Sequence, residues 1–207
     1  MRHTTLSLAA ATLALACAAA LAQPAADPAA IAAATQAIDA PSYVDDKLRL
    51  PANYREWIYL TSGFDMSYSA SSRMGHHMFD NVFVNPEAYR AFLKTGTWPD
   101  KTTIIIEVRG GQTRGSINKA GQYQDTEVMG REVHVRDEAR FPGKWAFFSF
   151  DDEQPATMIP RDVDCYSCHE KHGAVDSTFV QFYPTLLPGA KAKGTLAASY
   201  LAETDRP

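Results

Sequence analysis

The chain has 207 residues, with 20 Lys and Arg against 24 Asp and Glu, a formal net charge of −4. This mildly acidic balance, without basic clusters, argues against nucleic acid or an anionic membrane surface as the partner. The length suffices for one sizeable core and is short of two comfortable domains.

The first 22 residues predict a secretory signal peptide. A basic start at Arg2 is followed by an apolar stretch from about residue 6 to 16 and by a small-x-small cleavage site at Ala20-Leu21-Ala22. The apolar stretch is too short for a spanning helix, so we expect no membrane span. Cleavage would export the chain to the periplasm and leave 19 Lys and Arg against 24 Asp and Glu. Cys17 as the lipidated first residue of a lipoprotein is the alternative, but residues 14–16 match that signal poorly.

The exported chain divides into a leader and one domain. Residues 23–41, rich in Ala, Pro and Gln, predict a flexible or weakly helical leader. Residues 42–207 form the domain, because no repeat or charge block divides them. Within it, a short helix is expected to begin at Pro51 and to stop by Gly63. Its buried side would carry Tyr54, Trp57 and Ile58.

A second helix is predicted between Asn85 and Gly96. Asn85 is placed to cap it, Pro86 to occupy its first position, and Gly96 to end it. The apolar side chains of Tyr89, Phe92 and Leu93 fall on one face.

Four segments rich in β-branched and aromatic residues predict strands. They are residues 82–84, 103–108, 132–136 and 145–150. Since these strands and helices do not follow a repeating βαβ order, we expect an α+β fold with a mainly antiparallel sheet packed with a few short helices.

The most specific motif is Cys165-Tyr-Ser-Cys168-His169 near the C-terminal end. It is the attachment signature of a c-type haem. Two thiols at this spacing can add to the two haem vinyl groups, and a neutral His169 then serves as proximal iron ligand. We therefore predict one haem c, bound through two thioethers to Cys165 and Cys168, with His169 on the metal.

Other interpretations of the two cysteines fit less well. A zinc site would require two more Cys or His at ligand spacing, and the mature chain has no other cysteine. A redox Cys-x-x-Cys pair is the remaining alternative. The motif lies too late for a small electron-transfer cytochrome, and no Met follows His169; low-spin ligation would have to use Met129 or Met158. A cytochrome c′ bundle places the motif late but contains no strands.

From about Tyr54 to Pro184 the chain resembles the cytochrome P-460 family, whose members include the cytochrome c′-beta proteins. The order of several short segments carries the resemblance. They are Asn81-Val82-Phe83-Val84-Asn85, Trp98-Pro99-Asp100, Val133-His134-Val135-Arg136-Asp137, Gly143-Lys144-Trp145 and the haem motif.

The resemblance implies an antiparallel sheet packed with helices, usually in a dimer, and a five-coordinate haem with an open distal side. Such iron binds small ligands such as nitric oxide. In the catalytic branch of the family it oxidises hydroxylamine, and a lysine is cross-linked to the porphyrin. Here Ile106 occupies the best-matching position, and Lys101 or Lys119 would require a shifted alignment. We therefore expect no cross-link.

The sequence identifies the residues on the distal side of the haem less specifically than the proximal ligand. Glu132, His134 and Arg136 share one face of a predicted strand. In one interpretation they point at the open side of the haem, where a carboxylate would serve as a base or His134 as a sixth ligand. In the other they form a solvent-facing polar strip. Asp164, Glu170 or a backbone carbonyl would accept the other N–H of His169. We expect four phenylalanines to form core and pocket wall: Phe79, Phe83, Phe147 and Phe148.

Three functions remain open. The first is a periplasmic haem protein that captures nitric oxide or a similar small gaseous or nitrogenous ligand. The second is an oxidoreductase acting on hydroxylamine, nitric oxide or peroxide, and the third is a six-coordinate electron carrier with a redox protein as partner. The missing lysine argues against the second function and the missing methionine against the third, so ligand binding is the working hypothesis.

Overall fold

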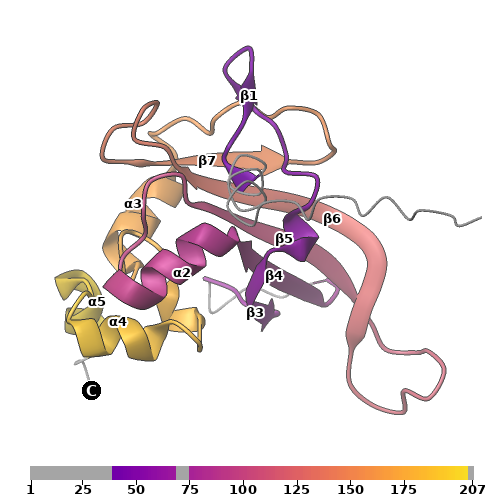
Figure 1. Cartoon of the computed structure of the whole chain (residues 1–207). Helices are drawn as coiled ribbons and strands as arrows, with labels where there is room; N and C mark the ends of the chain where they lie inside the picture. Colours follow the sequence, from indigo (N-terminus) through magenta and orange to yellow (C-terminus); the bar gives the residue numbers. More distant parts are fainter. Residues whose placement is uncertain (1–38, 69–74, 205–207) are drawn as a thin grey trace, which may run out of the picture.

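The computed structural model describes residues 39–68 and 75–204 (Figure 1). The predicted signal peptide, Cys17 and the leader up to residue 38 lie outside the described residues. Within them, two antiparallel sheets and four short α-helices confirm the α+β fold class. No helix in the described part is long and apolar enough to cross a membrane.

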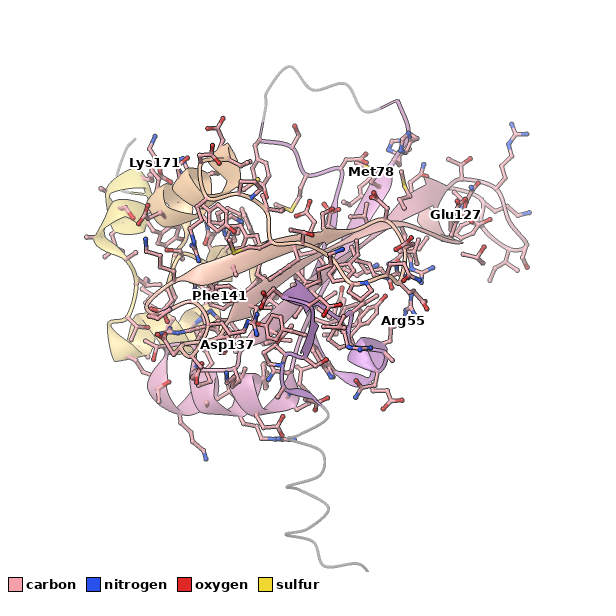
Figure 2. All side chains as sticks on the ribbon, turned by 90° about the horizontal axis from the view of Figure 1, so that it is seen from above. Arg55, Met78, Glu127, Asp137, Phe141 and Lys171 are labelled. Atoms are coloured by element: carbon pink, nitrogen blue, oxygen red, sulfur yellow. The ribbon has the colours of Figure 1, made fainter. Side chains whose placement is uncertain are left out.

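The main sheet is a meander in which every strand pairs with the next one along the chain. Its five strands are β3 (Ile58–Phe64), β4 (Met78–Val84), β5 (Thr103–Gln112), β6 (Tyr123–Arg136) and β7 (Trp145–Phe150). The short strands β1 (Tyr43–Val44) and β2 (Lys47–Leu48) form a separate hairpin. Beyond the sheet, β5 and β6 continue as an arm, which Glu127 marks in Figure 2.

Helices connect and follow the strands. They are the 3-10 turns η1 (Tyr54–Glu56) and η2 (Val180–Phe182) and the α-helices α2 (Pro86–Thr95), α3 (Asp164–His172), α4 (Leu187–Lys193) and α5 (Ala198–Thr204). Alternate residues of each strand point to opposite sides of the sheet, so the chain builds two cores. On the helix face, Ile104 and Phe147 pack with residues of α2 and α4. On the hairpin face, Ile105 and Val133 pack with residues of β2 and η1.

The helix predicted between Asn85 and Gly96 is confirmed as α2. Gly96 ends it with a φ of 81°, a left-handed conformation that glycine adopts without a steric penalty. The side chain of Asn85 does not cap the helix. It accepts a hydrogen bond from the Thr103 N–H at 2.9 Å and donates one to the Lys101 carbonyl at 3.2 Å. Asn85 thus ties the start of α2 to the start of β5.

The helix predicted between Pro51 and Gly63 is wrong. Only the single turn η1 forms, and β3 begins at Ile58. Tyr54 and Trp57 are buried as expected, but on the hairpin face, whereas Ile58 packs on the helix face. The three side chains therefore lie on opposite sides of a sheet rather than along one helical stripe.

Candidate haem site

The Cys-x-x-Cys-His motif lies on α3, a nine-residue helix. Because its residues follow the spacing i, i+3 and i+4, Cys165, Cys168 and His169 share one side of the helix. All three line a cavity of about 340 Å³ between α3 and the helix face of the sheet, here called the haem cavity. Both thiols are free, so they remain available for bonding to another group. Lys171 marks the outer surface of α3 in Figure 2.

The ring of His169 is held in the tautomer that an iron ligand requires. Its Nδ1–H donates to the Ser177 carbonyl at 2.9 Å, which leaves the lone pair on Nε2. Burial lowers the pKa of His169, and the bond to Ser177 only partly opposes this effect, so the ring is neutral near pH 7. Of the acceptors that the sequence suggested, the backbone carbonyl is the one used, and not Asp164 or Glu170.

Flat apolar side chains form the wall of the haem cavity. Phe147 stacks on Tyr166 with ring centroids 4.3 Å apart, and Phe179 lies 4.2 Å from the ring of His169. Ile159 completes this wall, and Phe148 borders the cavity although its side chain packs in the hairpin-face core. Such walls suit a porphyrin, and the exposed Cys165 lies at the rim, where a macrocycle edge would meet it. The described residues contain no group of three or more Cys, His, Asp or Glu arranged to hold a metal ion.

Two of the four phenylalanines predicted for core and wall do not line the haem cavity, although Phe83 packs against the core as predicted. Phe83 packs edge-on against Tyr54 on the hairpin face, and Phe79 packs against Phe64. Both belong to β4, where their positions place them opposite the cavity.

His134 lies beside His169 rather than opposite it. Its ring lines the haem cavity, is 6% exposed, and stacks on Phe147 with centroids 4.1 Å apart. The centroids of the two histidine rings are 4.7 Å apart with planes at 82°. Two imidazoles on opposite sides of one metal, each with a metal–nitrogen distance of about 2 Å, would have centroids roughly 6 Å apart. This arrangement does not suit His134 as a sixth ligand.

A second cavity of about 170 Å³ adjoins the haem cavity and shares Tyr68, Glu132 and Phe179 with it. Ile106 lines this second cavity and is the direct cross-strand partner of Glu132. Ile106, at which the sequence predicted that no lysine cross-link forms, therefore faces this cavity with an apolar side chain.

Glu132 and Asp80 bring two carboxyl groups to the second cavity. Burial raises the pKa of Glu132, and the charge of Asp80 raises it further. Burial likewise raises the pKa of Asp80, with a smaller contribution from Asp65. Sequence reasoning missed Asp80 because it began the strand at Val82, whereas pairing with β5 extends β4 to Met78. The polar strip on β6 thus faces the cavities at Glu132 and His134.

The remaining candidates lie outside both cavities. Arg136 donates to the Trp98 carbonyl at 2.9 Å. Lys101 pairs with Asp137, and Lys119 is exposed between β5 and β6. Neither lysine lines the haem cavity or the second cavity.

The methionines proposed as axial ligands are also remote. Met158 packs with the hairpin-face core, and the side chain of Met129 is 44% exposed on β6. Met66, which sequence reasoning did not consider, lines the second cavity. It is the one thioether among the described residues that line the two cavities.

Comparison with known families agrees with this geometry. The family described as Cytochrome P460 matches residues 51–180, a range that includes the whole main sheet, α2 and the motif on α3. No curated protein matches the sequence.

Proposed function

Because this chain belongs to the cytochrome P460 family of haem-binding cytochromes, we propose that it is a periplasmic protein with one covalent haem c. Cys165 and Cys168 form the two thioethers, and Nε2 of His169 ligates the iron. The iron is five-coordinate and binds small ligands such as nitric oxide.

One observation carries the proposal. The bond from His169 Nδ1–H to the Ser177 carbonyl leaves Nε2 of His169 available as a ligand. His134 lies beside His169, so it does not offer a second ligand from the opposite side. Bound haem would supply an iron with a vacant sixth position. The protein supplies a fixed proximal ligand and a cavity whose wall of Phe147, Phe179 and Ile159 favours small neutral molecules.

A second candidate function is oxidation of hydroxylamine, nitric oxide or peroxide. The observation in its favour is Glu132, a carboxyl group with a raised pKa at the junction of the two cavities. Such a group can hold or move a proton at a nearby ligand. The apolar side chain of Ile106 argues against the branch of the family that depends on a lysine cross-link.

The cofactor is tested on the exported protein by a pyridine haemochrome assay under denaturing conditions. We expect the wild type to show the spectrum of a c-type haem. Covalent retention of the haem should fail in Cys165→Ala and in Cys168→Ala, and it should be unchanged in Ser167→Ala. Ser167 is the matched control because it lies between the cysteines and its hydroxyl donates to the Asp164 carbonyl at 2.9 Å. Haem that remains attached in both cysteine variants would contradict covalent attachment at this motif.

The ligand site is tested by titrating the ferrous protein with nitric oxide, with Met66→Leu in parallel. An open iron predicts one nitric oxide per haem and the same affinity in the variant. If Met66 were the sixth ligand, its replacement would convert a low-spin, unreactive protein into a ligand-binding one. That outcome would support the electron-carrier alternative.

Export is tested by cell fractionation and by the mass of the mature protein. The proposal predicts a periplasmic protein that begins at Gln23 and carries one haem. A chain that retains residues 1–22, or a lipidated Cys17, would contradict this part of the proposal.

A further inference from the structure

The carbonyl that accepts the His169 N–H belongs to a tight turn, Val175–Thr178, here called the proximal turn. The Thr178 N–H donates to the Val175 carbonyl at 2.8 Å and closes it. Its two central residues, Asp176 and Ser177, have φ of 47° and 56°. Turns with both central residues left-handed strongly favour Asn, Asp or Gly followed by Gly; Asp176 fits this preference, but Ser177 stands where glycine is usual. The conformation therefore needs support from the surrounding structure.

The proximal turn packs directly against the end of α3. A Cβ at Gly173 would lie 2.6 Å from the His169 carbonyl oxygen and 2.6 Å from the Ser177 carbonyl carbon. Both neighbours are backbone atoms and cannot move aside as a flexible side chain would. The absence of a side chain at residue 173 thus lets Ser177 approach the ring of His169.

Trp98, between α2 and β5, holds the proximal turn at two points. Its backbone N–H donates to the Asp176 carboxylate at 3.0 Å, and its indole N–H donates to the Thr178 hydroxyl at 2.8 Å. Trp98 and Thr178 are each 2% exposed. The guanidinium of Arg136 donates to the Trp98 carbonyl at 2.9 Å and lies 3.5 Å from the Asp176 carboxylate.

We propose that Trp98 is a positioning residue for the proximal ligand. Through Asp176 and Thr178 it fixes the direction of the Ser177 carbonyl, and that carbonyl sets how strongly Nδ1–H of His169 is polarised. A stronger bond places more electron density on Nε2, which strengthens the iron–histidine bond and favours ferric iron. This inference rests on the proposed function, and it gives a role to the Trp98-Pro99-Asp100 segment singled out in the sequence.

Thr178→Val is the principal test because it keeps the shape of the side chain and removes the acceptor of the indole N–H. It also removes the bond from the Thr178 hydroxyl to the Val175 carbonyl at 2.6 Å, so the Asp176 variants below separate the effect of Trp98 from that of the turn itself. Thr195→Val is its matched control. The Thr195 hydroxyl bonds the carbonyl of Gly96, two residues before Trp98, at 2.8 Å and that of Ala190 at 3.2 Å, but has no bond to the proximal turn. Both variants are prepared with haem attached.

The expected result is a lower iron–histidine stretching frequency in the ferrous resonance Raman spectrum of Thr178→Val. The ferric-to-ferrous ratio at a fixed ambient potential should fall about three- to tenfold, at or below the usual effect of losing an outer partner of a metal ligand. Thr195→Val should match the wild type in both measurements. Equal values in Thr178→Val and wild type would overturn the proposal.

Asp176 gives an independent test on a partly exposed side chain, in case Thr178→Val does not fold. Asp176→Ala removes the acceptor of the Trp98 N–H, whereas Asp176→Asn keeps one. The proposal predicts a shifted stretching frequency in the first and its substantial recovery in the second. Identical frequencies in Asp176→Ala and wild type would contradict it. Because each comparison uses protein with haem attached, these failures differ from failure of the proposed function, which would appear as absence of haem c.

Discussion

Two glutamates on neighbouring strands show how differently the two faces of the sheet are built. Glu107 on β5 lies on the hairpin face and is 3% exposed. Burial alone would raise its pKa, but hydrogen bonds from Arg109, Tyr54 and Arg55 outweigh burial and hold the pKa below its ordinary value. Arg131 donates to Tyr54 at 3.0 Å and extends the network.

Glu132 on β6 lies on the helix face and has no comparable network. No described residue donates a hydrogen bond to its carboxylate, and its pKa is raised by burial and by the charge of Asp80. Glu107, with its oxygens bonded inside the core, serves the fold, whereas Glu132 is exposed toward the open cavity, has no such partners and is available to a ligand. Both faces therefore carry a core that stabilises the sheet, and only the helix face also contains the site.

Replacing one buried phenylalanine on each face tests this division most strongly. Phe147→Ala and Phe150→Ala should each lower the free energy of unfolding by about 3–5 kcal/mol, because both rings are buried. Only Phe147→Ala should also alter nitric oxide affinity and the ferrous spectrum, since Phe147 contacts His169 and His134. Urea unfolding and a ligand titration measure the two effects. A spectral change of equal size in Phe150→Ala would contradict the division.

The same substitution at the two glutamates gives the next largest effect. Glu107→Gln should lower the free energy of unfolding by about 2–3 kcal/mol, because it leaves the charges of Arg55 and Arg109 unbalanced. The loss is moderated since half of the Arg55 side chain is exposed. Glu132→Gln should not destabilise the protein at neutral pH. Urea unfolding at pH 7 compares them, and equal losses in both variants would show that Glu132 is also a structural group.

The smallest expected effect is a pH dependence at Glu132. Because the folded pKa is raised, the carboxyl favours folding below its unfolded pKa, and this contribution is lost as the pH rises through the folded pKa. Wild type should therefore lose stability relative to Glu132→Gln as the pH rises from about 4 to 8. The measurement is the difference between their free energies of unfolding across that range. A difference that does not vary with pH would contradict the raised pKa.

Short-range signals in the sequence predicted some elements closely. Proline and glycine marked both ends of α2, and the aromatic run at residues 145–150 predicted β7 with its observed bounds. These signals act within a few residues of the chain, so they can be recognised without tertiary contacts. The spacing of Cys165, Cys168 and His169 is another such signal, and their convergence on one cavity follows from their placement on α3.

Features fixed by distant contacts were not predictable. Asp80 enters the site because β4 pairs with β5 for its full length, with Asp80 opposite Val108. The helices α4 and α5 carry few large apolar residues, and they are held by contacts with α2 and α3. The Ser177 carbonyl, an acceptor without a side-chain signature, depends on a left-handed turn that contains no glycine or asparagine.

The coordination of the resting ferrous iron tests the central claim most directly. The absorption and resonance Raman spectra of the reduced protein, recorded at neutral pH without added ligand, report how many axial ligands the iron has. An iron held by His169 alone predicts a high-spin, five-coordinate spectrum with an iron–histidine stretching band. A sharp low-spin spectrum would show that a second side chain of this protein occupies the sixth position, and would contradict the open site.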